Sequence, residues 1–251
     1  MSGMPSSDDA DHPLIPRYLA LLWGREDPTP RRGPRPTLTV HDIGRAAVAI
    51  ADAQGVGAVS MKAIAAELGL TTMSLYRYVD SKDDVIEVMV DTAFGPCDPT
   101  LTATGTWRER LTSWALAAAS LSRERPWLAA IPLRRPPVGP NVLSWTDAGV
   151  RSFTDTGLTG QQKLSALLLV DGFVRHHVRQ ASQMGMLDAT DTGTGPTYEA
   201  MVSELVDHRL PHLAAAINDP GPPEDDDYFT TELTFGLSVI LDGIDALIES
   251  V

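Results

Sequence analysis

The sequence predicts an all-α protein with two domains, a small three-helix domain followed by a larger helical bundle. Three observations lead to this prediction. Apolar residues recur at helical spacing from Thr39 onward, and no convincing strand appears after Trp107. The 251 residues are enough for one small and one larger core. Glycine and proline gather between the periodic segments, as expected of loops that join helices.

Residues 1–38 are predicted to form a flexible extension with a basic arm. The first residues are acidic and poor in apolar side chains, which is typical of disorder. The segment LIPRYLALLW, at 14–23, forms a short apolar helix that we expect to pack on the protein body. Its apolar run is too short to span or to export through a membrane, so no membrane association and a cytoplasmic location are expected.

The small domain is predicted to begin with a long helix at Thr39. Thr39 and Asp42 have the spacing of a capping box. Gln54-Gly55 ends the helix, and one face is apolar, with Ile43, Ala46, Ala47 and Ile50.

Residues 60–82, SMKAIAAELGLTTMSLYRYVDSK, are predicted to be two helices joined by a tight turn. The first runs from Met61 to Leu68 after Ser60 as N-cap, and Gly69 ends it with positive φ. Thr71 caps the second, Thr72 to about Val79. A short helix with small polar side chains, held rigid by such a turn, fits the major groove of DNA. The segment therefore indicates a helix-turn-helix.

We expect side chains on this segment to divide into two kinds of DNA contact. Tyrosine hydroxyls and lysine bind phosphates, whereas the exposed side chains of the second helix reach the bases. Another interpretation stays open, because any helical hairpin can use Gly69 in this way and the tyrosines could be core aromatics. The predicted base or near-base contacts are Lys62, Thr72, Met73, Ser74 and Arg77, and the predicted phosphate contacts are Tyr76, Tyr78 and Lys82.

A third helix is predicted to start at Ser81, which with Asp84 forms a capping box. Lys82 then lies at a helix N-terminus, where free N–H groups and the helix dipole favour an anion. Val85, Val88 and Met89 point inward, and Gly95-Pro96 ends the helix.

The pattern Gly69-Leu70-x4-Leu75-Tyr76-Arg77-Tyr78-Val79-x2-Lys82 closely resembles the helix-turn-helix signature of the TetR family of transcriptional regulators. The resemblance covers about Thr39 to Phe94. It implies a DNA-binding domain at 39–95 and, at 96–251, an all-α domain that binds a small molecule and dimerises. Small residues or proline are also common at the position of Met73, which leaves its base preference open.

The net charge of −13 conflicts with DNA binding until its distribution is considered. Residues 31–82 carry seven basic and four acidic groups, whereas residues 83–251 carry eleven and twenty-four. The positive charge is therefore local, which orients one end of the protein toward DNA. Within it, Arg31, Arg32 and Arg35 precede the helix-turn-helix; they are either a solvated linker or an arm in the minor groove.

The larger domain is predicted to consist of helices at 107–123, 142–154, 161–184, 198–217 with an interruption at Pro211, and 228–249. The first half of 161–184 is apolar on almost all sides, which predicts burial on both sides. Gly236 and Gly243 share a face of the last helix and would allow a second helix to approach closely. Two strongly apolar helices exceed what a monomer needs and predict a four-helix homodimer interface.

A cavity for a small-molecule effector is expected among the helices of 107–215. Each candidate taken alone is more often a core residue, and at most one of the two adjacent histidines can point inward. The apolar and aromatic bias predicts an amphipathic or lipophilic effector. The candidate lining residues are Trp114, Leu121, Trp127, Trp145, Phe153, Phe173, His176, His177 and Met184.

Enzymatic function is not expected, because the sequence contains neither HExxH nor GxSxG. The single cysteine, Cys97, excludes an internal disulfide and a cysteine-based metal site, and neither metal nor cofactor is expected. The sequence thus predicts a ligand-responsive DNA-binding transcriptional regulator, a repressor released from a pseudo-palindromic operator by a small molecule. The alternative is a ligand-independent DNA-binding regulator or an activator.

Overall fold

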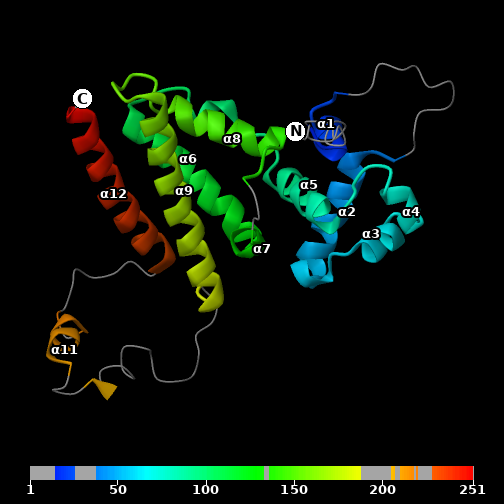
Figure 1. Cartoon of the computed structure of the whole chain (residues 1–251). Helices are drawn as coiled ribbons and strands as arrows, with labels where there is room; N and C mark the ends of the chain where they lie inside the picture. The colour runs from blue at the N-terminus through cyan, green and yellow to red at the C-terminus, as the bar shows by residue number, and fades with distance from the viewer. Residues whose placement is uncertain are drawn as a thin grey trace, which may run out of the picture. The chain divides into compact units, whose positions relative to one another are not determined.

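The computed structural model describes residues 15–25, 38–132, 136–187, 205–206, 210–217, 219 and 228–250. All regular structure in these residues is helical, which confirms the all-α prediction (Figure 1). The chain forms two compact units. Unit 1 contains residues 1–114 and 130–154, and unit 2 contains residues 115–129 and 155–251. This division differs from the predicted domain boundary at residue 95, which stays a prediction.

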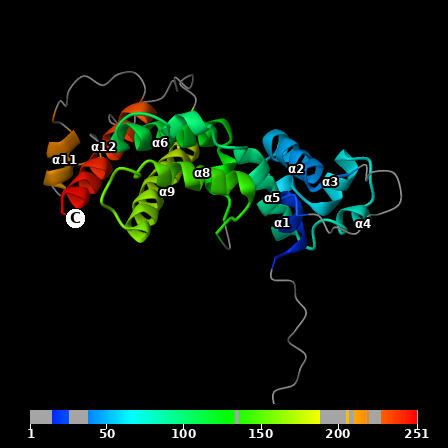
Figure 2. The same cartoon turned by 90° about the horizontal axis from the view of Figure 1, so that it is seen from above.

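The core of unit 1 is built on α2 (Val40–Gln54) and α5 (Lys82–Phe94), which lie side by side in both views (Figures 1 and 2). Both predicted capping boxes, at Thr39 and at Ser81, are present. The two helices approach so closely at Gly44 that a Cβ atom there would lie 2.1 Å from Thr92 Oγ1. The predicted apolar face of α2 is buried, with Ile43, Ala46, Ala47 and Ile50 all in the core.

The short helix α1 (Arg17–Leu22) packs on α2 and α5, as predicted for the apolar segment at 14–23. Tyr18 and Leu22 are buried, and the Tyr18 hydroxyl donates a hydrogen bond to Glu87 on α5. The Trp23 Nε1–H donates to the carbonyl of Val138 at 3.0 Å. These contacts make α1 part of unit 1.

Unit 1 is completed by the 3₁₀ helices η1 (Val56–Ala58) and η2 (Pro99–Thr102), the first part of α6 (Trp107–Glu124), and α8 (Pro140–Arg151). The buried guanidinium of Arg110 donates to the carbonyl of Ser152, with Nη2–O at 3.0 Å. The rings of Trp107 and Phe153 stack at 6.2 Å. The start of α6 is therefore fixed to the end of α8.

Unit 2 contains the rest of α6, α7 (Trp127–Ala130) except its last residue, α9 (Gly160–Gln183), α11 (Pro211–Ile217) and α12 (Tyr228–Glu249). Helices α9 and α12 are antiparallel neighbours, because Phe173 meets Gly236 and His177 meets Phe229 (Figure 1). Of the predicted helix at 198–217, α11 begins at the proline where an interruption was expected, and 198–204 lies outside the described residues.

Within the single chain, the first half of α9 is buried on one side only, so the predicted burial of its other side requires a partner. Ala166, Leu167 and Val170 are buried, but Leu168 is 70% exposed. Leu164 and Leu169 are also exposed, at 47% and 55%. Apolar periodicity alone could not separate burial within one chain from an apolar face that the chain leaves uncovered.

Candidate nucleic-acid interface and effector cavity

The helix-turn-helix consists of α3 (Met61–Glu67) and α4 (Thr72–Leu75). Ser60 caps α3, because its hydroxyl accepts the N–H of Ala63 at 3.1 Å. Gly69 has φ +65°, and two backbone bonds close the turn, from Gly69 to Ala66 at 3.1 Å and from Leu70 to Ala65 at 2.8 Å. This pair of bonds is a Schellman ending, which needs a residue with positive φ, as predicted for Gly69.

The second helix is shorter than predicted, since residues 76–78 form a turn rather than helix. Thr71 is the N-cap residue of this helix, as predicted, but its side chain makes no capping bond. Its hydroxyl instead pairs with the hydroxyl of Ser74 at 3.1 Å and accepts no backbone N–H. A neighbouring hydroxyl at hydrogen-bonding distance competes with the backbone, and spacing alone did not reveal this.

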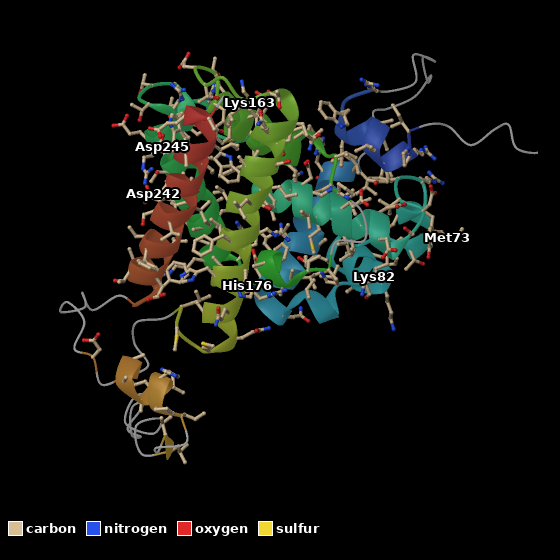
Figure 3. All side chains as sticks on the ribbon, turned by 60° about the vertical axis from the view of Figure 1, so that its left-hand side comes forward. Met73, Lys82, Lys163, His176, Asp242 and Asp245 are labelled. Atoms are coloured by element: carbon tan, nitrogen blue, oxygen red, sulfur yellow. The ribbon has the colours of Figure 1, made fainter. Side chains whose placement is uncertain are left out.

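Leu75 and Val79 are fully buried and fix the position of α4 on the core of unit 1. This anchoring turns the opposite side to solvent, and Met73 and Lys82 lie on the outside of unit 1 (Figure 3). Thr72 and Ser74 are partly exposed. We call the described DNA-contact candidates other than Tyr78, all of them at least partly exposed, the recognition surface; it consists of Lys62, Thr72, Met73, Ser74, Tyr76, Arg77 and Lys82.

Tyr78 lies outside this surface. Its half-buried hydroxyl donates to the backbone carbonyl of Leu38 at 2.8 Å, which ties the turn after α4 to the segment before α2. A phosphodiester oxygen has no proton to donate, so Tyr78 could bind phosphate only after giving up this bond. The structure therefore gives Tyr78 an anchoring role that the sequence did not reveal.

At the N-terminus of α5 the buried carboxylate of Asp84 accepts hydrogen bonds from two backbone N–H groups. Its Oδ2 accepts the N–H of Asp80 at 2.9 Å and that of Ser81 at 3.2 Å. These two N–H groups are therefore satisfied within the chain, and the bond from Ser81 belongs to the predicted capping box. The exposed ammonium of Lys82 is the group here that can meet a phosphate. The predicted arm residues Arg31, Arg32 and Arg35 lie outside the described residues.

A buried carboxylate joins α5 to the start of α8. Asp91 Oδ1 accepts the N–H groups of Asn141 at 2.9 Å and Val142 at 3.0 Å, and Asn141 Nδ2 donates back to the Asp91 carbonyl at 3.0 Å. Gly139 leaves room for this contact, since a Cβ there would lie 2.2 Å from Asp91 Oδ1. Burial raises the pKa of Asp91 above its usual range, although both backbone amides lower it.

Three of the predicted effector contacts lie in the core of unit 1. Trp114 Nε1 donates to the carbonyl of Trp145 at 2.8 Å, and Trp145 Nε1 donates to the carbonyl of Gly95 at 3.1 Å. Phe153 is fully buried against Trp107. These aromatic side chains hold α5, α6 and α8 together, and their indole N–H groups are occupied.

The other six candidates lie in unit 2. His177 stacks between Phe173 and Phe229, and its Nε2 lies 2.9 Å from the carbonyl of Phe229. His176 is exposed, as expected if only one of two adjacent histidines points inward. Met184 is 57% exposed, whereas Leu121 and Trp127 are half-buried.

Unit 2 contains a cavity of about 380 Å³ where α6 and α9 end. Arg123 forms one wall, with its guanidinium 5.0 Å from the Phe229 ring centre and a 3.0 Å hydrogen bond to the Leu187 carbonyl. None of the predicted effector residues lines this cavity. Its charged residues lie at helix ends, where the sequence gave no signal for a ligand site. Its lining residues are Arg123, Glu124, Pro126, Ser182, Gly185 and Leu187.

In the part of the chain that the structure describes, no helix has the length and apolar character needed to cross a membrane. Within the same residues, His, Cys, Asp and Glu side chains form no group that could hold a metal ion.

Sequence and structure comparisons identify the family. The model of bacterial regulatory proteins of the tetR family matches residues 43–89, and that of the tetracyclin repressor-like C-terminal domain matches residues 99–248. The HTH-type transcriptional repressor DrrR1 of Streptomyces coeruleorubidus is 36% identical over 242 residues, 93% of this chain and 87% of DrrR1.

Solved structures agree in fold. A possible TetR family regulator from Streptomyces coelicolor A3(2) has a TM-score of 0.62 and 26% identity, covering 83% of this chain and 99% of its own. The Streptomyces coelicolor protein ActR, in complex with actinorhodin, has a TM-score of 0.68 and 24% identity, covering 84% and 98%. The chain therefore belongs to the TetR family of DNA-binding transcriptional regulators, whose members are not enzymes.

Proposed function

We propose that this protein is a repressor that binds a pseudo-palindromic operator as a homodimer and is released by a small molecule. The observation that carries the proposal is the combination of an exposed recognition surface in unit 1 with a cavity in unit 2. Two relatives support it. DrrR1 is named a transcriptional repressor, and ActR has been crystallised with actinorhodin. DNA as target implies a cytoplasmic location.

A second copy of the chain is the proposed partner of the apolar face on α9 and α12. We define this dimer face as Leu164, Leu168, Leu169, Phe235 and Val239, all at least 47% exposed. The two helices contact each other, and we propose that these side chains form one surface within unit 2. An added Cβ at Gly172 or Gly243 would meet no atom within 4 Å, which leaves room for helices of the partner.

Dimerisation follows from the physics of this face. Large apolar side chains gain roughly 25 cal/mol for each Å² that they remove from water, so a self-complementary apolar face is stabilised by pairing. A two-fold axis then presents two recognition surfaces to half-sites about 34 Å apart on DNA.

The dimer is tested by sedimentation of the wild type and of Leu168→Glu at micromolar concentration. The variant should shift toward monomer, because pairing would bury its carboxylate. Leu116→Glu is the matched control, since Leu116 is also exposed in unit 2 but lies on α6. A monomeric wild type, or equal effects of the two variants, would contradict the proposal.

The effector is proposed to bind in the cavity of unit 2. Arg123, Glu124 and Ser182 offer hydrogen-bond donors and acceptors, which suits a ligand with polar groups on an apolar body. A ligand that prefers the conformation with the wrong half-site spacing lowers operator affinity by its differential affinity for the two conformations.

Operator release can be measured on a duplex selected from a random DNA library by the purified protein. Actinorhodin and a panel of amphipathic aromatic acids are then added, and loss of the complex is followed by gel shift. Arg123→Ala should raise the concentration needed for release at least tenfold, a cost in the range of a lost hydrogen bond to a charged group. Lys163→Ala, in the same unit but at the other end of α9, should not. Release that is equally sensitive in both variants would place the effector elsewhere.

A further inference from the structure

We infer that Met73 recognises the C5-methyl group of thymine, so that each operator half-site carries a thymine at the position facing α4. The inference rests on the proposed function and adds to it the identity of one base and the residue that selects it.

The first observation is the exposure of the Met73 side chain, which is 72% accessible to solvent (Figure 3). Leu75, two residues later, is fully buried, so α4 has a distinct inner and outer side. Met73 is thus presented to solvent by the same anchoring that positions the recognition surface. Its thioether gains nothing from water there and remains available for an apolar contact.

The second observation is the chemistry of its surroundings. Thr72, Ser74 and Arg77 are polar or charged, and only Leu70 in the preceding turn, 39% exposed, adds an aliphatic side chain nearby in sequence. A patch this small is far below the surface that a stable protein partner needs. Met73 therefore differs from the dimer face of unit 2, where five large apolar side chains are exposed on two contacting helices.

The third step concerns what the major groove offers to an apolar side chain. Its floor presents hydrogen-bonding groups on every base pair, and the thymine methyl is its one apolar group. Methionine is flexible and polarisable, so it can adapt to a methyl group. Against the cytosine amino group or the guanine O6, the same side chain would exclude water without replacing the lost hydrogen bond. Met73 therefore favours thymine in two ways: it contacts the methyl group, and it disfavours bases whose polar groups would lose their water.

The hydroxyls on either side do not provide this discrimination. Ser and Thr hydroxyls donate and accept, so they bind several base edges. The Ser74 hydroxyl, in addition, already pairs with Thr71 at 3.1 Å. Arg77 is suited to guanine rather than thymine.

The test begins with selection of a binding site from a random DNA library, once with the wild type and once with Met73→Gln, which has similar length but a polar end. The wild type should enrich a thymine at one position of each half-site, and Met73→Gln should lose that preference. In the selected duplex, each thymine is then replaced singly by deoxyuridine, which removes the methyl group alone. At the Met73 position this should weaken wild-type binding about fourfold, the value expected for one buried methyl group.

Met73→Leu and Lys82→Ala serve as controls for Met73→Gln in these binding measurements. Met73→Leu keeps an apolar side chain and should retain the effect of the methyl group, whereas Met73→Gln should bind thymine and uracil duplexes equally. Lys82→Ala should weaken both duplexes by the same factor, because a phosphate contact does not sense the base.

A duplex with 5-methylcytosine at the Met73 position provides an independent check, since it restores the methyl group on a different base pair. It should bind more tightly than the same duplex with cytosine. If the wild type selects a sequence but no thymine shows a methyl effect that depends on residue 73, the inference is wrong while the proposed function stands. If the wild type selects no sequence at all, the proposed function itself fails.

Discussion

Replacing Asp91 separates the hydrogen-bonding role of this carboxylate from its charge. In Asp91→Ala the N–H groups of Val142, which is buried, and of Asn141, which is half-buried, lose their acceptor. An unsatisfied buried amide costs about 1–3 kcal/mol, and a half-buried one less, so unfolding free energy should fall by about 2–4 kcal/mol. In Asp91→Asn an amide oxygen can accept the same two bonds without burying a charge, and the change should stay within about 1 kcal/mol.

The pKa of Asp91 also predicts how the stability difference between the wild type and Asp91→Asn changes with pH. The pKa of Asp91 is raised in the folded protein by burial, so the folded state binds the proton more tightly than the unfolded chain. Its favourable contribution is therefore complete below the unfolded pKa near 3.8 and is lost as pH rises through the folded pKa. Relative to Asp91→Asn, the wild type should gain stability as pH is lowered from 7 toward 4.

Asp98 is the matched control with the opposite sign. This exposed carboxylate accepts the N–H of Thr100 at 2.8 Å, and that bond lowers its pKa. Its contribution is present at neutral pH and is lost as pH falls through the lowered pKa. Relative to Asp98→Asn, the wild type should thus lose stability on acidification.

Urea denaturation between pH 4 and 7, followed by circular dichroism and tryptophan fluorescence, measures both pairs. If Asp91→Ala were as stable as Asp91→Asn, the bonds to α8 would not stabilise unit 1. If the Asp91 and Asp98 pairs shifted with pH in the same direction, the cause given for the Asp91 pKa would be wrong.

The other predictions concern single positions. Gly236→Ala should lower thermal stability, because the new Cβ would lie 2.3 Å from Phe173 Cζ. At Gly243 an added Cβ would meet no atom within 4 Å, so Gly243→Leu should act on dimerisation, measured by sedimentation. Lys82→Ala should weaken binding to all DNA sequences about equally and reduce the slope of log affinity against log salt by about one; an altered sequence preference would refute its phosphate role. Deletion of residues 1–36 tests whether Arg31, Arg32 and Arg35 enter the minor groove, and deletion of residues 1–24 is its control. If the arginines bind there, the longer deletion should lower operator affinity more than the shorter one. Equal affinity of the two deletions would reduce that segment to a linker.

The sequence predicted those parts of the fold that depend on local chemistry. The capping boxes at Thr39 and Ser81 and the positive φ of Gly69 each follow from residues within a few positions of one another, and all three are present. Thr71 is also the N-cap residue that was predicted, but its side chain makes no capping bond, since its hydroxyl has a competing partner in Ser74.

Long-range contacts were not predictable in this way. The bonds from Asp91 to Asn141 and Val142 join residues about fifty positions apart, and no spacing rule connects them. The same holds for the cavity, whose walls come from residues 123–126 and 182–187. Aromatic character pointed to Trp114, Trp145 and Phe153 as ligand contacts, but large aromatic side chains serve equally well to fill a core, as they do here.

The inclusion of α8 in unit 1 has a consequence for the construction of chimeric regulators. An exchange made at residue 95, the boundary predicted from sequence, would supply the recipient with α5 but with a foreign α8. The Asp91 carbonyl would then lose the side-chain amide of Asn141, the carbonyl of Gly95 would lose the indole of Trp145, and a side chain in place of Gly139 would collide with the Asp91 carboxylate. A transplant that carries residues 136–154 along with the helix-turn-helix preserves these contacts. The portable part of this regulator is thus discontinuous in sequence.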